Sequence, residues 1–131
     1  MYSKQDIIKY RIERAKESLT EAKILSESGH WNTVANRLYY SVFYAVNSLF
    51  IKYDINSSSH SGTKTIFNKE FIKSGILDKN AGQLYNNLFN KRQEGDYQDF
   101  QFFDEKTIYP LIEKVEDFIY SIENLLYPTK S

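Results

Sequence analysis

The chain contains no cysteine, which excludes a disulfide framework and any metal site that depends on thiolates. Glycine and proline are scarce, with 5 and 2 of the 131 residues, and this argues against an all-β fold built on many tight turns. The formal net charge is zero, with 17 basic and 17 acidic side chains, so the chain lacks the positive field of a non-specific DNA binder. We therefore expect no DNA partner.

Long apolar runs are also missing. The N-terminal stretch MYSKQDIIKYRIERAK is charged throughout, and no apolar run approaches the roughly 18 residues of a membrane span. Together with the absence of cysteine, this predicts an intracellular, cytoplasmic protein without a membrane partner. The 2 histidines, His30 and His60, have no H-E-x-x-H spacing, and there is no glycine-rich phosphate loop, so we expect no metal and no cofactor.

The most informative stretch that is present runs from His30 to Phe50, HWNTVANRLYYSVFYAVNSLF. At about 100° per residue its apolar side chains form one stripe on a helix. The stripe consists of Trp31, Val34, Ala35, Leu38, Val42, Ala45, Val46 and Leu49. Tyr39, Phe43 and Phe50 widen it, so more than half of the circumference is apolar or aromatic, which predicts a central helix covered by several neighbours.

Apolar spacing and capping residues predict the other helices. The first spans about residues 4–28 and ends at Gly29, and a polar loop over 54–62 precedes a short helix over 63–73. The next helix begins at Asp78 or Asn80 and stops near Gly95. Residues 94–104 show no helical period and are expected to form a connection packed by its rings.

The last helix has two alternative starts. Either Pro110 lies in its first turn, or Asp104 caps an earlier start that Pro110 would bend. Residues 127–131 are expected to fray. The whole chain, 1–131, is thus expected to form one domain with its core at about 4–127, an all-α, up-and-down bundle of four long helices plus one short helix.

The back of the central helix is polar but carries large rings, namely Arg37, Tyr40, Tyr44 and Asn47. Their spacing of three and four residues places them on one face, which suits a contact surface and predicts a dimer interface. Arg92 continues the inward line of Leu84 and Leu88, where an arginine is costly without an anion or a carboxylate.

Two interpretations of these arginines remain open. Arg37 and Arg92 could converge with tyrosine hydroxyls to bind a phosphate, or they could be structural arginines paired with Asp96, Glu94 or Asp99. His60 likewise either holds its serine-rich loop or acts as an acid-base group.

Several segments together resemble a known family. They are Asn36–Ala45 (NRLYYSVFYA), Ser59–Gly62 (SHSG), Phe67–Gly75, and Arg92–Tyr97 (RQEGDY). This pattern resembles the HEPN superfamily, and within it the short stand-alone proteins grouped as UPF0332. The resemblance implies a helical bundle that dimerises through its polar helix face around a cleft, often as the partner of a minimal nucleotidyltransferase in a toxin–antitoxin pair.

Catalytic relatives, the resemblance implies, are metal-independent ribonucleases with an arginine followed after four to six residues by a histidine. Arg92 matches the arginine, but Tyr97, Gln98 and Asp99 occupy the positions of the histidine. Neither tyrosine nor an ordinary aspartate exchanges protons near neutral pH. Asp96 beside Arg92 is expected to have a lowered pKa, which leaves His60 as the candidate acid-base group.

The leading hypothesis is a homodimer that binds a nucleotide or RNA end and docks a nucleotidyltransferase. Its predicted ligand-binding residues are Arg37, Tyr40, Arg92, Asp96 and Tyr97. Tyr97 is the tyrosine that such a transferase would modify. One alternative is an RNA-cleaving toxin in which Arg92 and His60 are catalytic; the other is a helical adaptor without a ligand.

Overall fold

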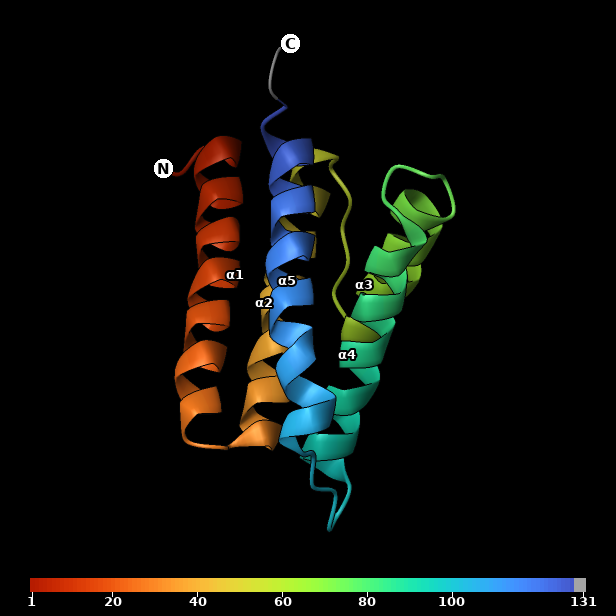
Figure 1. The fold of residues 1–131 in the computed structure, drawn as a ribbon. Coiled ribbons are helices and arrows are strands. Elements are labelled where there is room, and N and C mark those ends of the chain that lie inside the picture. The colour runs from red at the N-terminus through yellow and green to blue at the C-terminus, as the bar shows by residue number, and fades with distance from the viewer. Residues whose placement is uncertain (129–131) are drawn as a thin grey trace.

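The computed structural model describes residues 1–128 and contains only helices and their connections over that range (Figure 1). The long helices are α1 (Lys4–Glu27), α2 (Trp31–Lys52), α4 (Lys79–Tyr97) and α5 (Glu105–Leu126). A short α3 (His60–Phe67) continues into the π-helical turn η1 (Asn68–Ile72). The long helices alternate in direction along the bundle, which confirms the predicted all-α, up-and-down architecture (Figure 1).

Helix α1 begins and ends as its sequence indicates. The Ser3 hydroxyl accepts a hydrogen bond from the Asp6 amide, and the Asp6 carboxylate accepts one from the Ser3 amide, which is a complete capping box. Gly29 has φ of +73°, a left-handed conformation that glycine adopts without a Cβ penalty. The chain therefore reverses at once into α2, and α1 and α2 pack as an antiparallel hairpin.

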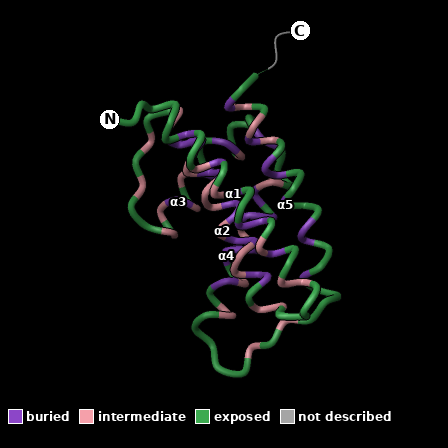
Figure 2. The backbone as a smooth tube through the Cα atoms, turned by 90° about the vertical axis from the view of Figure 1, so that its left-hand side faces the viewer, coloured by how far each residue is buried: buried purple, intermediate pink, exposed green. Residues whose placement is uncertain are grey.

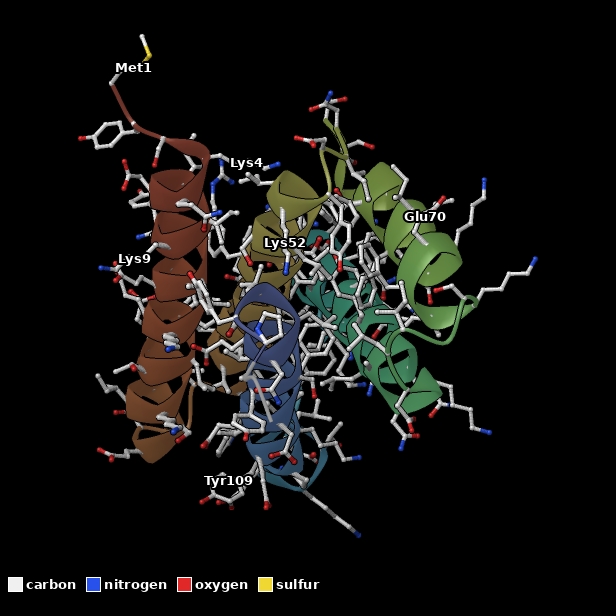
Figure 3. The ribbon with its side chains drawn as sticks, turned by 90° about the horizontal axis from the view of Figure 1, so that it is seen from above. Met1, Lys4, Lys9, Lys52, Glu70 and Tyr109 are labelled. Carbon is white, nitrogen blue, oxygen red and sulfur yellow. The ribbon has the colours of Figure 1, made fainter. Side chains whose placement is uncertain are left out.

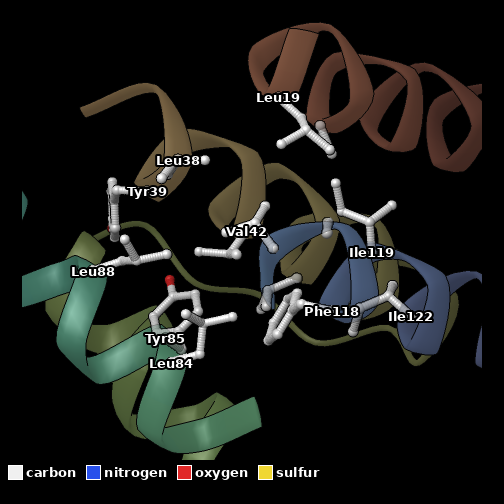
Figure 4. Packing of buried hydrophobic residues seen from close by; sticks show 14 of the residues in the cluster. Leu19, Leu38, Tyr39, Val42, Leu84, Tyr85, Leu88, Phe118, Ile119 and Ile122 are labelled. Carbon is white, nitrogen blue, oxygen red and sulfur yellow. The ribbon is translucent and has the colours of Figure 1, made fainter. Parts of the chain in front are cut away.

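Helix α2 is the centre of the bundle, as predicted. It packs against α1, α4 and α5, and every residue of the predicted stripe is buried except Trp31, which is half-buried. Figure 4 shows side chains of the four long helices directed toward one another around Val42. Along the chain, buried positions follow the helices, whereas the connection that leads from α4 to α5 is largely exposed (Figure 2).

The short helix starts earlier than predicted. The loop expected over 54–62 ends at Ser59, because the Ser59 hydroxyl accepts a hydrogen bond from the Gly62 amide and caps α3. His60 is consequently the first residue of α3 and not part of the loop. Helix α4 is capped by Asp78, which is one of the two starts predicted for it.

Helix α4 ends at Tyr97, two residues beyond Gly95, near which its end was predicted. A Cβ on Gly95 would lie 3.3 Å from the Phe103 ring. The missing side chain thus leaves room for this ring, and Gly95 lies inside the helix and does not end it. The expected ring packing after α4 is wrong for most rings, since Phe100 is 90% exposed and Phe102 79%. Asn32 holds the connection instead, through the Gln101 carbonyl at 2.7 Å and the Phe103 amide at 2.8 Å.

Helix α5 takes the earlier of its two predicted starts. Asp104 caps it by accepting a hydrogen bond from the Thr107 amide at 2.9 Å, and the helix runs through Pro110. At its other end Tyr127 is the cap, and its amide donates to the Glu123 carbonyl at 2.8 Å. The fraying predicted for the tail otherwise concerns residues 129–131, which lie outside the described residues.

A lysine at the end of α2 bonds the last turn of α5. The Lys52 ammonium donates to the carbonyl oxygens of Leu125 and Leu126, which lack partners within α5 (Figure 3). Among the described helices, none combines the length and the apolar character that crossing a membrane requires.

Candidate functional site

The polar face of α2 is only partly covered by the rest of the chain. Arg37, Tyr40, Tyr44 and Asn47 are all half-buried, and three- and four-residue spacing brings them onto one side of the helix. Helix α4 lies beside this face and supplies Arg92, Asp96 and Tyr97 from its last two turns. The structure thus places all of the predicted ligand-binding residues on two packed helices.

Arg92 is the most unusual of these side chains, because it is only 8% exposed. Its guanidinium carbon lies over three tyrosine rings, at 5.2 Å from the centroid of Tyr39, 5.7 Å from Tyr40 and 5.8 Å from Tyr97. Arg92 Nη2 donates to the Tyr97 hydroxyl at 3.3 Å. We call Arg92 and these three rings the Arg92 cluster; its cation–π contacts stabilise the guanidinium without neutralising it.

The carboxylate nearest to Arg92 satisfies it poorly. Asp96 Oδ2 is 3.4 Å from Arg92 Nε, yet Nε is buried and has no partner of hydrogen-bonding geometry among the described residues. Asp96 also accepts from the Asn36 amide at 3.3 and 3.4 Å, so its charge is shared between α2 and α4. A buried guanidinium with an unpaired N–H is a site that an additional anion would stabilise.

Arg37 comes close to the cluster but is more fully paired. Its Nη1 lies 3.3 Å from Glu21, and its Nε and Nη2 donate to the Asn36 side-chain oxygen at 3.2 and 3.0 Å. Its guanidinium carbon is 5.2 Å from the centroid of the Tyr40 ring, which Arg92 also contacts. The two arginines therefore converge on one ring. Of the predicted carboxylate partners, Asp96 lies beside Arg92, whereas Arg37 pairs with Glu21, which was not predicted. Phosphate binding by the two arginines stays a prediction.

His60 joins the cluster through Tyr39. Its Nδ1 is 2.7 Å from the Tyr39 hydroxyl, and its ring centroid is 4.5 Å from that of Phe43. Burial and the nearby charge of Arg92 lower the pKa of His60, so the imidazole is neutral at pH 7. His60 Nδ1 thus contacts a side chain of α2. From the sequence, one expectation was that His60 would instead hold its own loop.

The tyrosines beneath the cluster are uncharged at neutral pH. Burial raises the pKa of Tyr39 to about 12 and also raises the pKa of Tyr85. The Tyr85 hydroxyl is buried, points toward the side of α2 that carries Tyr39, and has no hydrogen-bond partner among the described residues (Figure 4). Tyr85 was not among the residues that the sequence assigned to the site.

A further arginine was missed in the sequence. Arg14 of α1 lies with its guanidinium carbon 5.2 Å from the Tyr44 ring centroid, and its Nη2 donates to the Tyr44 hydroxyl at 3.5 Å. Glu17 pairs with it at 3.1 Å. Arg14 belongs to a helix face of mixed charge, and that pattern alone does not distinguish a residue that extends a neighbouring polar face from one that is simply solvated.

No group of histidines and carboxylates within residues 1–128 is arranged to hold a metal ion. Tyr97, Gln98 and Asp99 occupy the positions after Arg92 where the sequence resemblance implied a catalytic histidine. The site is therefore a tyrosine-lined surface with two arginines, each close to a carboxylate, and with His60 behind it.

Comparison with known proteins places the chain in a family. A UPF0332 protein of Thermotoga maritima is 38% identical over 130 residues, which is 99% of this chain and 98% of that protein. Two proteins of Methanocaldococcus jannaschii that are named as candidate toxins are 40% identical over 86 residues (66% of this chain, 58% of that protein) and 30% identical over 112 residues (86% and 78%). The HEPN domain matches residues 8–125, so the chain belongs to the HEPN domain family, and its whole-length similarity is to a UPF0332 protein.

Proposed function

We propose that this chain is the HEPN partner of a minimal nucleotidyltransferase in a toxin–antitoxin-type module, and that as a homodimer it binds a nucleotide or RNA without cleaving it. The observation that carries this proposal is the Arg92 guanidinium, 8% exposed, contacted by three tyrosine rings and left with an unpaired Nε. The names of the relatives from Methanocaldococcus jannaschii support the toxin–antitoxin context.

Arginine is suited to this role because its planar fork binds phosphate through two parallel hydrogen bonds. Asp96 is too poorly aligned with Arg92 to satisfy the guanidinium, so an incoming phosphate would gain the N–H that the carboxylate leaves unpaired. Tyr97 is 73% exposed beside it and can stack on a base or donate a hydroxyl. Arg37 and Tyr40 extend the same surface along α2.

Binding is favoured over cleavage because the residues around Arg92 are poor proton carriers at neutral pH. Tyr39 has a pKa of about 12 and stays protonated. The one neutral imidazole, His60, already uses Nδ1 in its contact with the Tyr39 hydroxyl.

The half-buried face formed by Arg37, Tyr40, Tyr44 and Asn47 is the proposed dimer interface. A second copy placed there would bring its own arginines to the same surface and cover the half-buried rings. Tyr97 is the proposed acceptor for the partner transferase: its hydroxyl would attack the α-phosphate of a nucleoside triphosphate, forming a phosphodiester and releasing pyrophosphate and a proton.

Thermal unfolding with and without ATP and a short RNA tests the binding proposal. A ligand that binds only the folded protein raises the melting temperature, and Arg92→Ala should lose that rise. Lys91→Ala is the matched control, since Lys91 is the preceding residue of α4 but contacts the Phe103 ring at 5.6 Å from its centroid. No rise with either ligand in the unmutated protein would overturn the proposal and favour an adaptor whose arginines are structural.

One observation favours the ribonuclease alternative as a second candidate. Tyr39 links the two candidate catalytic residues, because its ring contacts Arg92 and its hydroxyl contacts His60. This alternative requires that the purified protein cleave a structured RNA and that His60→Ala abolish the cleavage. An intact RNA after incubation with the unmutated protein would remove it.

A further inference from the structure

A polar cavity lies beside the start of α3, next to His60. It encloses about 340 Å³ between α1, the second half of α2, the loop that follows α2, and the first turn of α3. This volume is at the small end of the range of about 300–1,000 Å³ typical of ligand sites. Its lining consists of Arg11, Phe43, Asn47, Phe50, Ile51, Ile55, Asn56, Ser57, Ser58, Ser59, His60 and Thr63.

The charge of this cavity has one sign. Arg11 is the single ionised side chain in the lining, which contains neither aspartate nor glutamate. Arg11 is half-buried and forms no ion pair or side-chain hydrogen bond within residues 1–128. Asp54, which precedes the loop residues of the lining, is paired with Lys4 at 3.1 Å, so its charge is already compensated.

Two hydroxyls of the serine-rich loop are already hydrogen-bonded within the chain. Ser57 Oγ lies 2.8 Å from Thr63 Oγ1, and Ser59 Oγ accepts from the Gly62 amide at 2.9 Å. A Cβ on Gly62 would lie 2.7 Å from Ser59 Oγ, so the close approach of this hydroxyl requires glycine. Because Ser59 caps α3 and Ser57 contacts Thr63, the side chains left for a ligand are Asn56 and Ser58 of the loop together with those on the other walls.

Those remaining side chains are hydrogen-bond donors without partners. The amide of Asn47 forms no hydrogen bond within the described part of the chain, and Arg11 offers its whole guanidinium. His60 uses Nδ1 for Tyr39, which leaves its second ring nitrogen for the cavity. With Nδ1 accepting from the Tyr39 hydroxyl, a neutral His60 carries its proton on that second nitrogen and is a donor.

A larger groove between α4 and α5, of about 610 Å³, lacks this one-sided charge. Its lining includes two carboxylates, Asp78 and Asp117, and one cation, Lys114. An anion would meet repulsion there and attraction at Arg11.

We infer that the cavity at Arg11, Asn47 and His60 binds a phosphate group, the terminal phosphate of an RNA or the phosphate of a nucleotide. The inference rests on the proposed function for the source of the phosphate and deepens it by adding a second subsite. The His60 ring contacts the Tyr39 hydroxyl, and the Tyr39 ring contacts Arg92, so this subsite is joined to the Arg92 cluster through packed side chains.

The test compares two short RNAs of one sequence, with and without a 5′-phosphate, and adds AMP and inorganic phosphate as separate probes. Binding of the phosphorylated RNA should be roughly tenfold tighter, the usual effect of one charge-assisted contact. Arg11→Gln should remove that difference in affinity between the two RNAs. Lys9→Gln, an exposed lysine on the same helix, is the charge-matched control and should keep the difference.

Nuclear magnetic resonance supplies a readout that needs no variant. Inorganic phosphate and AMP should shift the His60 ring and Arg11 Nε signals in a saturable way, and a bound anion should raise the pKa of His60 because it favours the imidazolium. Equal affinity for the two RNAs together with unchanged His60 signals would overturn the subsite.

The subsite and the proposed function can fail separately. If RNA binds, is lost in Arg92→Ala and is indifferent to its 5′-phosphate, the subsite is wrong and the proposed function stands. If neither RNA stabilises the protein but phosphate and AMP shift His60 in the unmutated chain and not in Arg11→Gln, the subsite stands and the proposed RNA function is wrong.

Discussion

The buried polar groups on the two sides of helix α2 differ in whether they have hydrogen-bond partners. Toward α1, the buried Ser41 hydroxyl donates to the Ala15 carbonyl at 2.7 Å and is satisfied. Toward α4, Tyr85 Oη and Arg92 Nε are buried without a hydrogen-bond partner among the described residues. Since buried polar atoms in folded proteins are nearly always paired, the first side is complete and the second side is the one that an added group would complete.

The difference matters because it separates stability from function on one helix. Residues on the α1 side should carry stability, and their truncation should cost free energy of unfolding. Residues on the α4 side should contribute less stability than their burial implies, because part of their burial leaves polar atoms unpaired. The predictions below test this contrast.

The largest effect is expected from a truncation in the apolar stripe of α2. Leu49 is fully buried in the central stripe, so Leu49→Ala should lower the free energy of unfolding by about 2–5 kcal/mol through lost burial and a cavity. Urea denaturation monitored by circular dichroism measures this. Ile24→Ala is the control, because Ile24 is 60% exposed and its truncation should change stability by less than about 0.5 kcal/mol. Similar losses for both variants would contradict the assignment of α2 as the centre.

A smaller loss of stability is expected when the hydrogen-bonded polar group on the α1 side is removed. Ser41→Ala deletes the donor to the Ala15 carbonyl and should cost about 0.5–1.5 kcal/mol. Ser121→Ala removes a local bond to the Asp117 carbonyl one turn back on α5, and its effect should be smaller. If Ser41→Ala stabilised the protein, the contrast between the two sides would be lost.

On the α4 side a polar deletion should have the opposite sign. Tyr85→Phe removes a buried hydroxyl that has no partner, so it should leave stability unchanged or raise it by up to about 1 kcal/mol. Tyr39→Phe is the matched comparison, because it removes a hydroxyl that contacts His60 Nδ1 at 2.7 Å and should destabilise. A destabilised Tyr85→Phe would show that its hydroxyl has a partner in solution and that this side is also complete.

The helices were predictable because their apolar side chains repeat with the helical period. Ile8, Ile12, Ala15 and Leu19 on α1 are buried as that period requires, and Arg92 is buried because it continues the line of Leu84 and Leu88. Periodicity places a residue on a face but not beside a particular neighbour. The three tyrosine rings around Arg92 come from two helices, and their meeting depends on how α2 and α4 pack.

Other features of the site depend on short-range details that periodicity does not contain. The start of α3 follows from one hydrogen bond between Ser59 and Gly62, and this bond turns His60 from a loop residue into a neighbour of Tyr39. Arg11 and Arg14 were missed because the charged side of α1 has both signs, which is also the pattern of a solvated helix. The site therefore needed the three-dimensional packing, whereas the fold did not.

The smallest expected effect is a dependence of stability on pH that His60 introduces. Burial and the charge of Arg92 lower its pKa in the folded protein, so the unfolded chain binds the proton more readily. Stability should therefore be full above the unfolded pKa of about 6.5 and fall as the pH drops below it. Urea midpoints for the unmutated protein and for His60→Gln, measured between about pH 7.5 and 5.5, should converge on acidification, because only the first loses this contribution.

A bound phosphate should reduce the slope of stability against pH, since an anion beside His60 opposes the lowering of its pKa. A slope that is the same in both proteins would place His60 outside the field of Arg92 and would remove the link between the two arginine sites.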